Sequence, residues 1–203
     1  MFFMQIKRLG DNFSYIVADE KTGEAAVIDP SFNTEPIKKV LKKHNFNLKF
    51  IINTHGHGDH TAGNQELKKE FKAKILAHKH SSVGKDLSLE DGSVIKVGEI
   101  PIRVIHTPGH TRDSISLLVE GKLLTGDTLF VGECGRTDLP GGSPEEMYKS
   151  LFEKILALDD SVEVYPGHDY GPSPSSTIGE EKRTNYTLKK RTLEEFIEFM
   201  KQP

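Results

Sequence analysis

The sequence predicts an α/β protein built as one domain over residues 1–203. Two observations support this prediction. Short apolar segments with the composition of β-strands alternate along the chain with amphipathic segments that have the periodicity of helices. No low-complexity tract or flexible linker interrupts the alternation, and 203 residues suit a compact domain with one sizeable core.

The N-terminal third is predicted to contain three strands, followed by a helix and a fourth strand. The three strands are expected at residues 2–9, 13–18 and 24–28, with a turn at 21–23. Thr34 is expected as the N-cap of the helix, and Pro36 lies in its first turn. The fourth strand, at residues 48–52, leads directly into a histidine-rich segment.

Turn residues and apolar runs predict the elements beyond that segment. A helix is expected at 65–71, and strands at 73–77, 94–97, 100–105, 115–119, 122–124 and 162–165. Glu120-Gly121 is typical of a tight hairpin turn. A long helix is expected at 144–158, with Ser143 and Glu146 forming a capping box, and a closing helix at 193–200.

Composition and charge narrow the classes of function. The formal net charge of −3 offers no general attraction for nucleic acid, and no apolar run approaches the roughly 18 residues that a membrane span needs. The first residues lack the basic and apolar regions of a secretory signal. The single cysteine, Cys134, excludes an internal disulfide and fits a reducing compartment. We therefore expect a cytoplasmic protein that binds neither nucleic acid nor membrane; monomer and homodimer both remain open.

The most specific chemical signal is segment 53–60, Asn-Thr-His-Gly-His-Gly-Asp-His. Chance would produce its His-x-His-x-Asp-His pattern in roughly one chain per thousand at this composition. His55 and His57, two residues apart as the chain leaves a strand, point to one side and can bind one metal ion. The intervening glycines let the backbone turn, so that Asp59 and His60 can face a second ion. Imidazole and carboxylate ligands suit Zn²⁺ or Fe²⁺.

Three later segments have the same character. His110 follows a Pro-Gly turn, Asp127 follows an apolar strand, and His168 follows another Pro-Gly turn. Each lies at the expected end of a strand, where loops at one edge of a sheet carry functional residues. The remaining histidines are not expected to bind metal: His78 and His80 are expected on an exposed segment, His106 as a structural neighbour of His110, and His44 at the end of a helix.

Together these motifs resemble the metallo-β-lactamase superfamily over nearly the whole chain, in the branch that contains glyoxalase II and the persulfide dioxygenases. The resemblance implies a four-layer αββα sandwich with a dinuclear metal site at one edge. The matching ligand positions are His55, His57 and His110 for the first ion, Asp59, His60 and His168 for the second, and Asp127 as the bridging carboxylate. Asp29 matches a position that orients a ligand.

Departures from other branches of the superfamily narrow the activity. Asp127 stands where the zinc β-lactamases carry a cysteine, which argues against antibiotic hydrolysis. His57 stands where the diiron flavoproteins of this fold carry a glutamate. We expect no nuclease, since neither the extra domain nor the basic patch of that branch is evident.

The resemblance implies a metal-dependent hydrolase of the glyoxalase II type, acting on a thioester or ester of the hydroxyacyl-glutathione kind. Two ions sharing Asp127 would lower the pKa of a bound water from about 16 towards about 7, and the hydroxide would attack the polarised carbonyl. Asp59 is expected to take up the proton.

Two further residues are candidate contacts for the small-molecule substrate, which we expect to be a thiol conjugate. Arg136 could bind a substrate carboxylate, or could instead pair with Asp138. Tyr170, just after a predicted ligand, could line the same site. Cys134 is expected to be an inert, buried thiol.

A second function remains open, that of a mononuclear iron persulfide dioxygenase. Segments 134–138 and 168–170 look more like those enzymes and some short hydrolases than like classical glyoxalase II. Glyoxalase II carries an aromatic residue in place of Thr137-Asp138 and has a C-terminal helical region for glutathione. One Fe²⁺ would then be held by His55, His110 and Asp127, a triad with open positions for O₂ and for glutathione persulfide or a related low-molecular-weight persulfide. Other substrates of the fold, such as lactones, also remain open.

Overall fold

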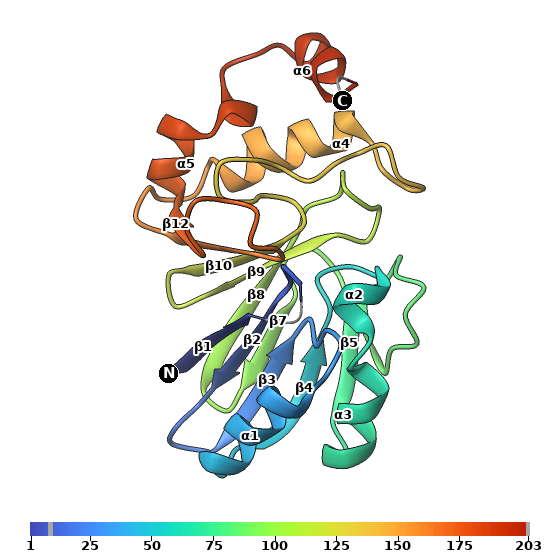
Figure 1. The fold of residues 1–203 in the computed structure, drawn as a ribbon, viewed down its shortest axis with the longest axis vertical. Coiled ribbons are helices and arrows are strands. Elements are labelled where there is room, and N and C mark those ends of the chain that lie inside the picture. Colours follow the sequence, from blue (N-terminus) through green and yellow to red (C-terminus); the bar gives the residue numbers. More distant parts are fainter. Residues whose placement is uncertain (8–9, 202–203) are drawn as a thin grey trace.

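The computed structural model describes residues 1–7 and 10–201. Its strands form two six-stranded sheets (Figure 1). The sheets pack face to face, and helices cover the outer face of each. This arrangement is the predicted αββα sandwich.

The first sheet follows chain order, β1-β2-β3-β4-β5-β6. Its strands are β1 (Phe2–Lys7), β2 (Phe13–Ala18), β3 (Glu24–Ile28), β4 (Asn47–Ile52), β5 (Lys74–His78) and β6 (Leu87–Leu89). β1, β2 and β3 pair antiparallel, whereas β4, β5 and β6 continue the sheet in parallel. Parallel pairs require crossover connections, which here contain α1 (Glu35–Lys43), the short α2 (Gly58–Thr61) and α3 (Asn64–Phe71).

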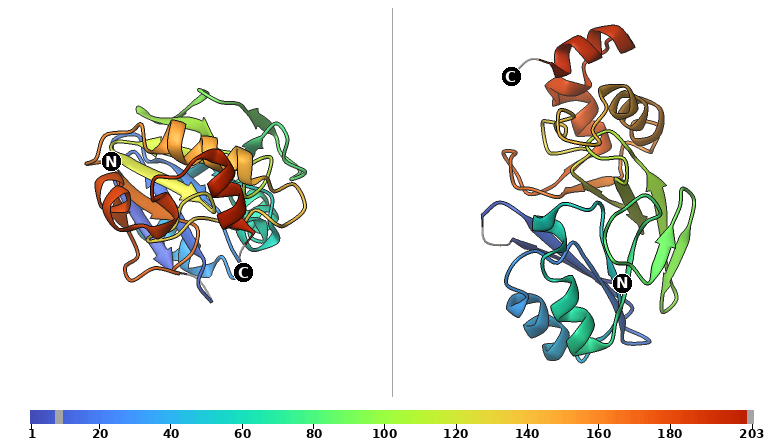
Figure 2. Two further views of the ribbon diagram at one scale, coloured as in Figure 1. Left: turned by 90° about the horizontal axis from the view of Figure 1, so that it is seen from above. Right: turned by 90° about the vertical axis from the view of Figure 1, so that its right-hand side faces the viewer.

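The second sheet has the order β12-β11-β10-β9-β8-β7. Its strands are β7 (Val94–Val97), β8 (Ile100–His106), β9 (Ile115–Val119), β10 (Lys122–Gly126), β11 (Glu163–Pro166) and β12 (Ser176–Thr177). The helical segments that follow β10 are α4 (Pro144–Tyr148), a π-helix (Lys149–Ile155), α5 (Ile178–Thr184), a 3₁₀ turn (Tyr186–Leu188) and α6 (Leu193–Met200). They gather at the end of the molecule away from α1 and α3 (Figure 2).

Side-chain alternation along the strands separates the core into layers. Tyr15 and Val17 of β2 lie between the two sheets, whereas Ile16 and Ala18 pack on the opposite face with α1 and α3. A strand that is buried on both faces is apolar throughout rather than alternating, which explains the continuous run in β2. A third cluster, which includes Met147, joins the second sheet to the C-terminal helices.

Most predicted elements are confirmed, five of them with unchanged bounds: β2, β3, β7, β9 and α6. The last two residues of the predicted strand 2–9 lie outside the described residues. The predicted helix 144–158 is wrong in its regularity, because the α-helix gives way to a π-helix at Lys149 that ends at Ile155. The short elements α2, β6, β12, α5 and the 3₁₀ turn were not predicted.

Two predicted helix caps differ in detail from the structure. Thr34 occupies the N-cap position of α1 but makes no capping hydrogen bond. The backbone N–H of Glu146 donates to Oγ of Ser143 at 3.2 Å, as expected. No capping box forms, because the N–H of Ser143 donates instead to the carbonyl of Gly109 at 2.8 Å. That bond ties α4 to the loop that carries His110.

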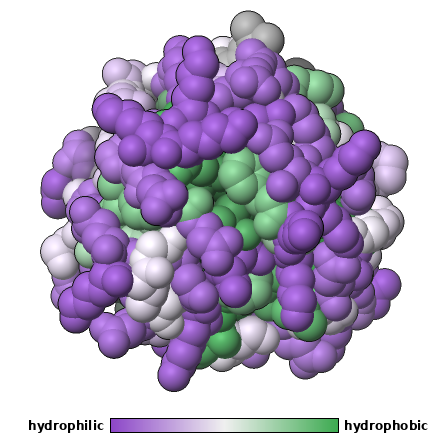
Figure 3. Space-filling model, turned by 90° about the horizontal axis from the view of Figure 1, so that it is seen from below, coloured by the Kyte–Doolittle hydropathy of each residue, from purple (hydrophilic) through white to green (hydrophobic). Residues whose placement is uncertain are grey.

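The end of the molecule opposite α6 is mostly hydrophilic, with apolar side chains showing in a central hollow (Figure 3). Among the helices of residues 1–7 and 10–201, none is long and apolar enough to cross a membrane.

Candidate metal centre

Loops at one edge of the sandwich bring all seven predicted ligands together. The loop after β4 of the first sheet carries His55, His57, Asp59 and His60. In the second sheet, His110 follows β8, Asp127 follows β10 and His168 follows β11. Their ligand atoms form three overlapping groups, each able to hold a metal ion. Asp127 lies between the two ends of the cluster, as a bridging residue would.

The first group consists of three histidines. Nδ1 of His57 lies 3.0 Å from Nε2 of His55 and 3.1 Å from Nε2 of His110. Oδ2 of Asp127 lies 3.9 Å from Nε2 of His55 and 3.6 Å from Nε2 of His110. The four atoms therefore face a common point.

The second group consists of Asp59, His60 and His168. The Nε2 atoms of the two histidines are 3.1 Å apart, and Oδ2 of Asp59 lies 3.4 Å from each of them. Asp127 closes this group too, with Oδ1 at 3.4 Å from His60 and Oδ2 at 3.3 Å from His168.

These separations fit metal coordination. A tetrahedral ion with bonds of about 2.0–2.1 Å holds its ligand atoms about 3.3 Å apart. Two imidazole nitrogens at such short range have little other reason to converge. Oδ1 of Asp127 is also buried and has no hydrogen-bond partner among the described residues, an arrangement that a bound cation would satisfy. The donor set is therefore able to bind metal.

Hydrogen bonds on the far side of the imidazole rings orient the ligands. Nδ1 of His60 lies 3.0 Å from Oδ2 of Asp29. Because a carboxylate can only accept, Nδ1 carries the proton and Nε2 is free to bind metal. Nδ1 of His110 likewise donates to the Arg136 carbonyl at 2.8 Å. Asp29 also accepts from the N–H and Oγ1 of Thr54, at 2.8 and 2.6 Å, so the predicted orienting role of Asp29 agrees with its contacts.

Two supporting residues were missed by the sequence reasoning. Oδ1 of Asp11 lies 3.1 Å from Nδ1 of His168, and Nδ2 of Asn12 donates to Oδ2 of Asp59 at 2.9 Å. Both residues lie in the loop between β1 and β2, far from the ligands in sequence. Polar residues in a turn gave no local signal, because their role depends on how the two sheets are stacked.

The electrostatics of the cluster favour an ionised Asp127. Burial alone would raise the pKa of this carboxyl, but the neighbouring His60 and His55 hold the pKa well below its usual range. Burial in turn lowers the pKa of His55 well below its ordinary value. An ionised Asp127 and a neutral His55 are the forms that bind metal. For His60, burial alone would lower the pKa, but the effect of Asp127 and Asp29 outweighs burial and raises the pKa well above its ordinary value, so a metal ion would displace a proton from this ring.

Glycines allow the loops to approach these ligands closely. A Cβ on Gly167 would lie 2.3 Å from Oδ1 of Asp127 and 2.9 Å from Cε1 of His60. A Cβ on Gly135 would lie 1.8 Å from the carbonyl oxygen of Asp127. A side chain at position 167 would displace the carboxylate of Asp127, and one at position 135 would displace its backbone.

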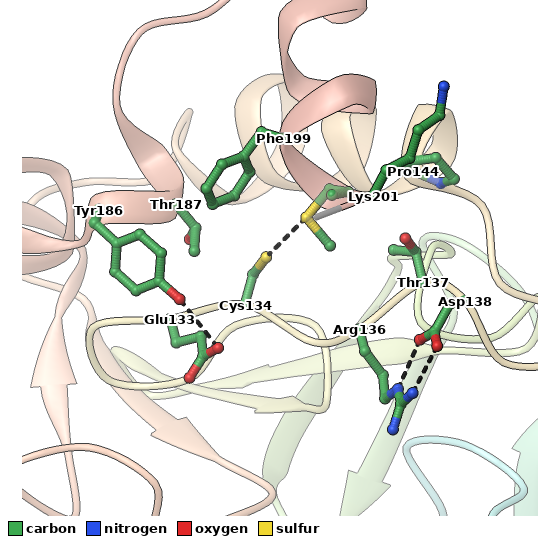
Figure 4. A pocket seen from close by; sticks show the side chains of 11 residues that line it. Glu133, Cys134, Arg136, Thr137, Asp138, Pro144, Tyr186, Thr187, Phe199 and Lys201 are labelled. Carbon is green, nitrogen blue, oxygen red and sulfur yellow. Dashed lines mark hydrogen bonds and ion pairs between the residues drawn. The ribbon is translucent and has the colours of Figure 1, made fainter. Parts of the chain in front are cut away.

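The loop 132–138 lines one side of a cavity of about 900 Å³ under α6 (Figure 4). Arg136 and Asp138 form a two-bond ion pair at 2.6 Å, and both side chains are exposed. Cys134 points to the other side of the loop, where its thiol contacts Sδ of Met200 at 3.8 Å. Burial raises the pKa of this thiol to about 12, in keeping with the inert role expected for it.

Tyr170 lies beside the second group. Its ring stacks on that of His168, with centroids 4.8 Å apart and an interplanar angle of 7°. Phe130 packs edge-on against both rings. The Tyr170 side chain is 52% exposed, so its outer face is accessible to a small molecule near the metal centre.

The histidines outside the centre are not all exposed, contrary to expectation. His78 is buried, at 2% relative exposure, and its ring stacks on that of His106 with centroids 4.0 Å apart. His80 lies next to both. The prediction of exposure was wrong for His78, although His80 is exposed as expected. The end of β5 packs against the end of β8, a contact between the two sheets that alternation within one strand does not reveal.

The family comparison matches most of the chain. A model of the metallo-beta-lactamase superfamily matches residues 8–168. The chain is 37% identical over 179 residues to the cytoplasmic hydroxyacylglutathione hydrolase of Arabidopsis thaliana, covering 84% of this chain and 68% of that protein. It is 33% identical over 192 residues to the human mitochondrial persulfide dioxygenase ETHE1, covering 93% of this chain and 75% of the human one.

A solved structure is similar over the full length. The crystal structure of ETHE1 from Myxococcus xanthus superposes with a TM-score of 0.95 at 32% identity, covering all of this chain and 91% of the other. The relatives in sequence thus include both a hydroxyacylglutathione hydrolase and a persulfide dioxygenase.

Proposed function

The chain belongs to the metallo-beta-lactamase superfamily, and on that premise we propose that it is a hydroxyacylglutathione hydrolase-like enzyme that cleaves a small thioester or ester. The observation that supports hydrolysis most directly is the completeness of both donor groups, which share Asp127. The mononuclear reaction would use only His55, His110 and Asp127 as metal ligands.

We propose Zn²⁺ or Fe²⁺ as the ions, held by the seven residues of the two groups. When bound, such ions polarise a carbonyl and lower the pKa of water towards about 7. The residues orient the ions and the substrate. Asp127 fixes the two positions relative to each other, and the buried imidazoles exclude bulk water from one side of the centre.

Asp59 is the proposed acceptor of the proton released when water attacks the carbonyl carbon. Its side chain is 36% exposed, so the proton can pass on to solvent. Asn12 holds one carboxylate oxygen of Asp59 in place at 2.9 Å. This combination of a fixed position and partial exposure suits a group that accepts a proton and then releases it.

The proposed substrate is a small thiol conjugate that lies between Tyr170 and the loop 132–138. The exposed face of Tyr170 can pack against the thiol carrier. Arg136 can bind a carboxylate of the carrier by exchanging its partner Asp138, since the ion pair is exposed and therefore weakly held. We further propose a cytoplasmic protein, monomeric or homodimeric, with no nucleic-acid partner.

A mononuclear iron persulfide dioxygenase is the second candidate. His55, His110 and Asp127 form a two-histidine, one-carboxylate set in this structure, which is the ligand type of non-haem iron oxygenases. The similarity to the human and Myxococcus xanthus proteins favours this candidate specifically.

One experiment separates the two candidates. The protein is purified without added metal, its metal ions are counted, and S-lactoylglutathione cleavage is measured beside oxygen uptake with glutathione persulfide. We expect two ions per chain and thioester cleavage. One iron per chain with oxygen uptake and no cleavage would refute the hydrolase proposal. The variant His168→Ala adds a second readout: it should abolish hydrolysis but impair a mononuclear dioxygenase only mildly.

A further inference from the structure

The loop between β1 and β2 supports two of the three ligands that belong to the second group alone. Asp11 lies 3.1 Å from the outer nitrogen of His168, through Oδ1. Asn12 donates its side-chain amide to Oδ2 of Asp59 at 2.9 Å, the same oxygen that faces the two Nε2 atoms of the group. One dipeptide thus holds one ligand from each sheet.

Main-chain bonds hold this dipeptide against the loop that carries His168. The N–H of Asp169 donates to the carbonyl of Asp11 at 2.7 Å. Asn12 and His168 form an isolated antiparallel bridge. Because the backbone of Asp11 and Asn12 is hydrogen-bonded to the loop that carries His168, the positions of these two side chains relative to their partners are fixed.

The first group has different supports. Nδ1 of His110 bonds to the Arg136 carbonyl at 2.8 Å, and Nδ1 of His55 lies 3.2 Å from Oγ1 of Thr54. Neither contact involves the β1–β2 loop. A change at Asp11 or Asn12 therefore acts on one metal position and leaves the supports of the other unchanged.

We propose that Asp11 and Asn12 are positioning residues that set the affinity of the second metal position, and thereby the number of ions that the protein holds. A carboxylate on Nδ1 fixes the tautomer of His168 and makes its Nε2 a stronger ligand. An amide on Asp59 fixes the orientation of its carboxylate. This inference rests on the proposed function, because dinuclear hydrolysis needs the second position and mononuclear iron chemistry does not.

Zn²⁺ binding to metal-depleted protein tests the inference directly. Wild type, Asp11→Ala and Asn12→Ala are each titrated in competition with a chromophoric chelator, and the ions retained after dialysis are counted by elemental analysis. Loss of such a supporting partner typically weakens metal binding about 10–100-fold. We expect that loss at one ion per chain in both variants, with the affinity for the other ion unchanged. Asp11→Asn, which keeps an acceptor without the charge, should recover part of the loss.

Lys7→Ala is the matched control. Lys7 pairs with Asp169 at 2.5 Å beside the same loop, but it contacts none of the seven ligands. We expect this variant to bind two ions as the wild type does. Circular dichroism of each metal-depleted variant establishes that the fold is retained.

Three outcomes would overturn the inference. They are a wild-type protein that holds only one ion tightly, variants that hold two ions with wild-type affinity, and variants in which both affinities fall equally. Two tight ions without thioester cleavage would contradict the proposed function instead and leave this inference standing.

Discussion

Replacing Gly167 by alanine tests whether the shared carboxylate must lie where the structure places it. The added Cβ would come within 2.3 Å of Oδ1 of Asp127, whereas ordinary contacts begin at 3.4 Å. The carboxylate or the loop must therefore move by about 1 Å, a misplacement of the size that costs about 100-fold in rate. Overpacking at such a site also destabilises the fold by about 1–3 kcal/mol.

The assay compares kcat/KM for thioester cleavage, ions per chain and the thermal midpoint. We expect Gly167→Ala to lose about 100-fold in kcat/KM and part of its metal. Gly84→Ala is the control, since a Cβ there meets nothing within 4 Å, and it should behave as the wild type. Full activity and two ions in Gly167→Ala would refute the reasoning, because the position of Asp127 would then not matter.

Three further predictions follow from buried groups. Asp29→Asn tolerates the positive φ of 49° at this position, but its one acceptor oxygen cannot serve the N–H and Oγ1 of Thr54 and Nδ1 of His60 together. The free energy of unfolding should therefore fall by about 1–3 kcal/mol in urea titrations; an unchanged midpoint would contradict this. Cys134 should resist alkylation by iodoacetamide at pH 8 until the protein is unfolded, because burial raises the pKa of its thiol to about 12; rapid labelling of folded protein would show that the thiol is accessible. Burial, together with the charge of a neighbouring imidazole, lowers the pKa of His78 to about 4, whereas its value in the unfolded chain is about 6.5. As the pH falls, the unfolded state therefore binds the proton first. The folded protein should lose stability between about pH 6.5 and about pH 4. In metal-depleted protein, His78→Gln should show a smaller loss over this range than the wild type, and equal pH profiles would count against the assignment.

The sequence predicted best those features that depend on local pattern. β2 was placed correctly because an apolar run bounded by turn residues has few other interpretations. The spacing of His55, His57, Asp59 and His60 predicted a metal site without any knowledge of the fold, and the structure brings those residues together. Their role as metal ligands is a prediction that the metal content of the purified protein tests.

Features that depend on the stacking of the two sheets were not predictable. His78 was expected on an exposed segment, yet it is buried and stacks on His106 of the other sheet. In the sequence, Asp11 and Asn12 are ordinary turn residues. Their contacts with the candidate metal ligands arise only because the loop after β11 lies beside them. The capping box at Ser143 was wrong because of another contact between segments distant in sequence: the carbonyl of Gly109 accepts the N–H bond of Ser143 that Glu146 was expected to accept.

The division of the ligands between the two sheets has a consequence for the life of the polypeptide. An ion bound by His55 of the first sheet and His110 of the second closes a long loop, as a disulfide does, and such closures stabilise most by restricting the unfolded chain. With a single cysteine, the chain cannot obtain an intramolecular cross-link of that kind from sulfur. Newly made protein that has not yet acquired metal would then open more readily to proteases, which would make its abundance follow the supply of metal as well as the rate of synthesis.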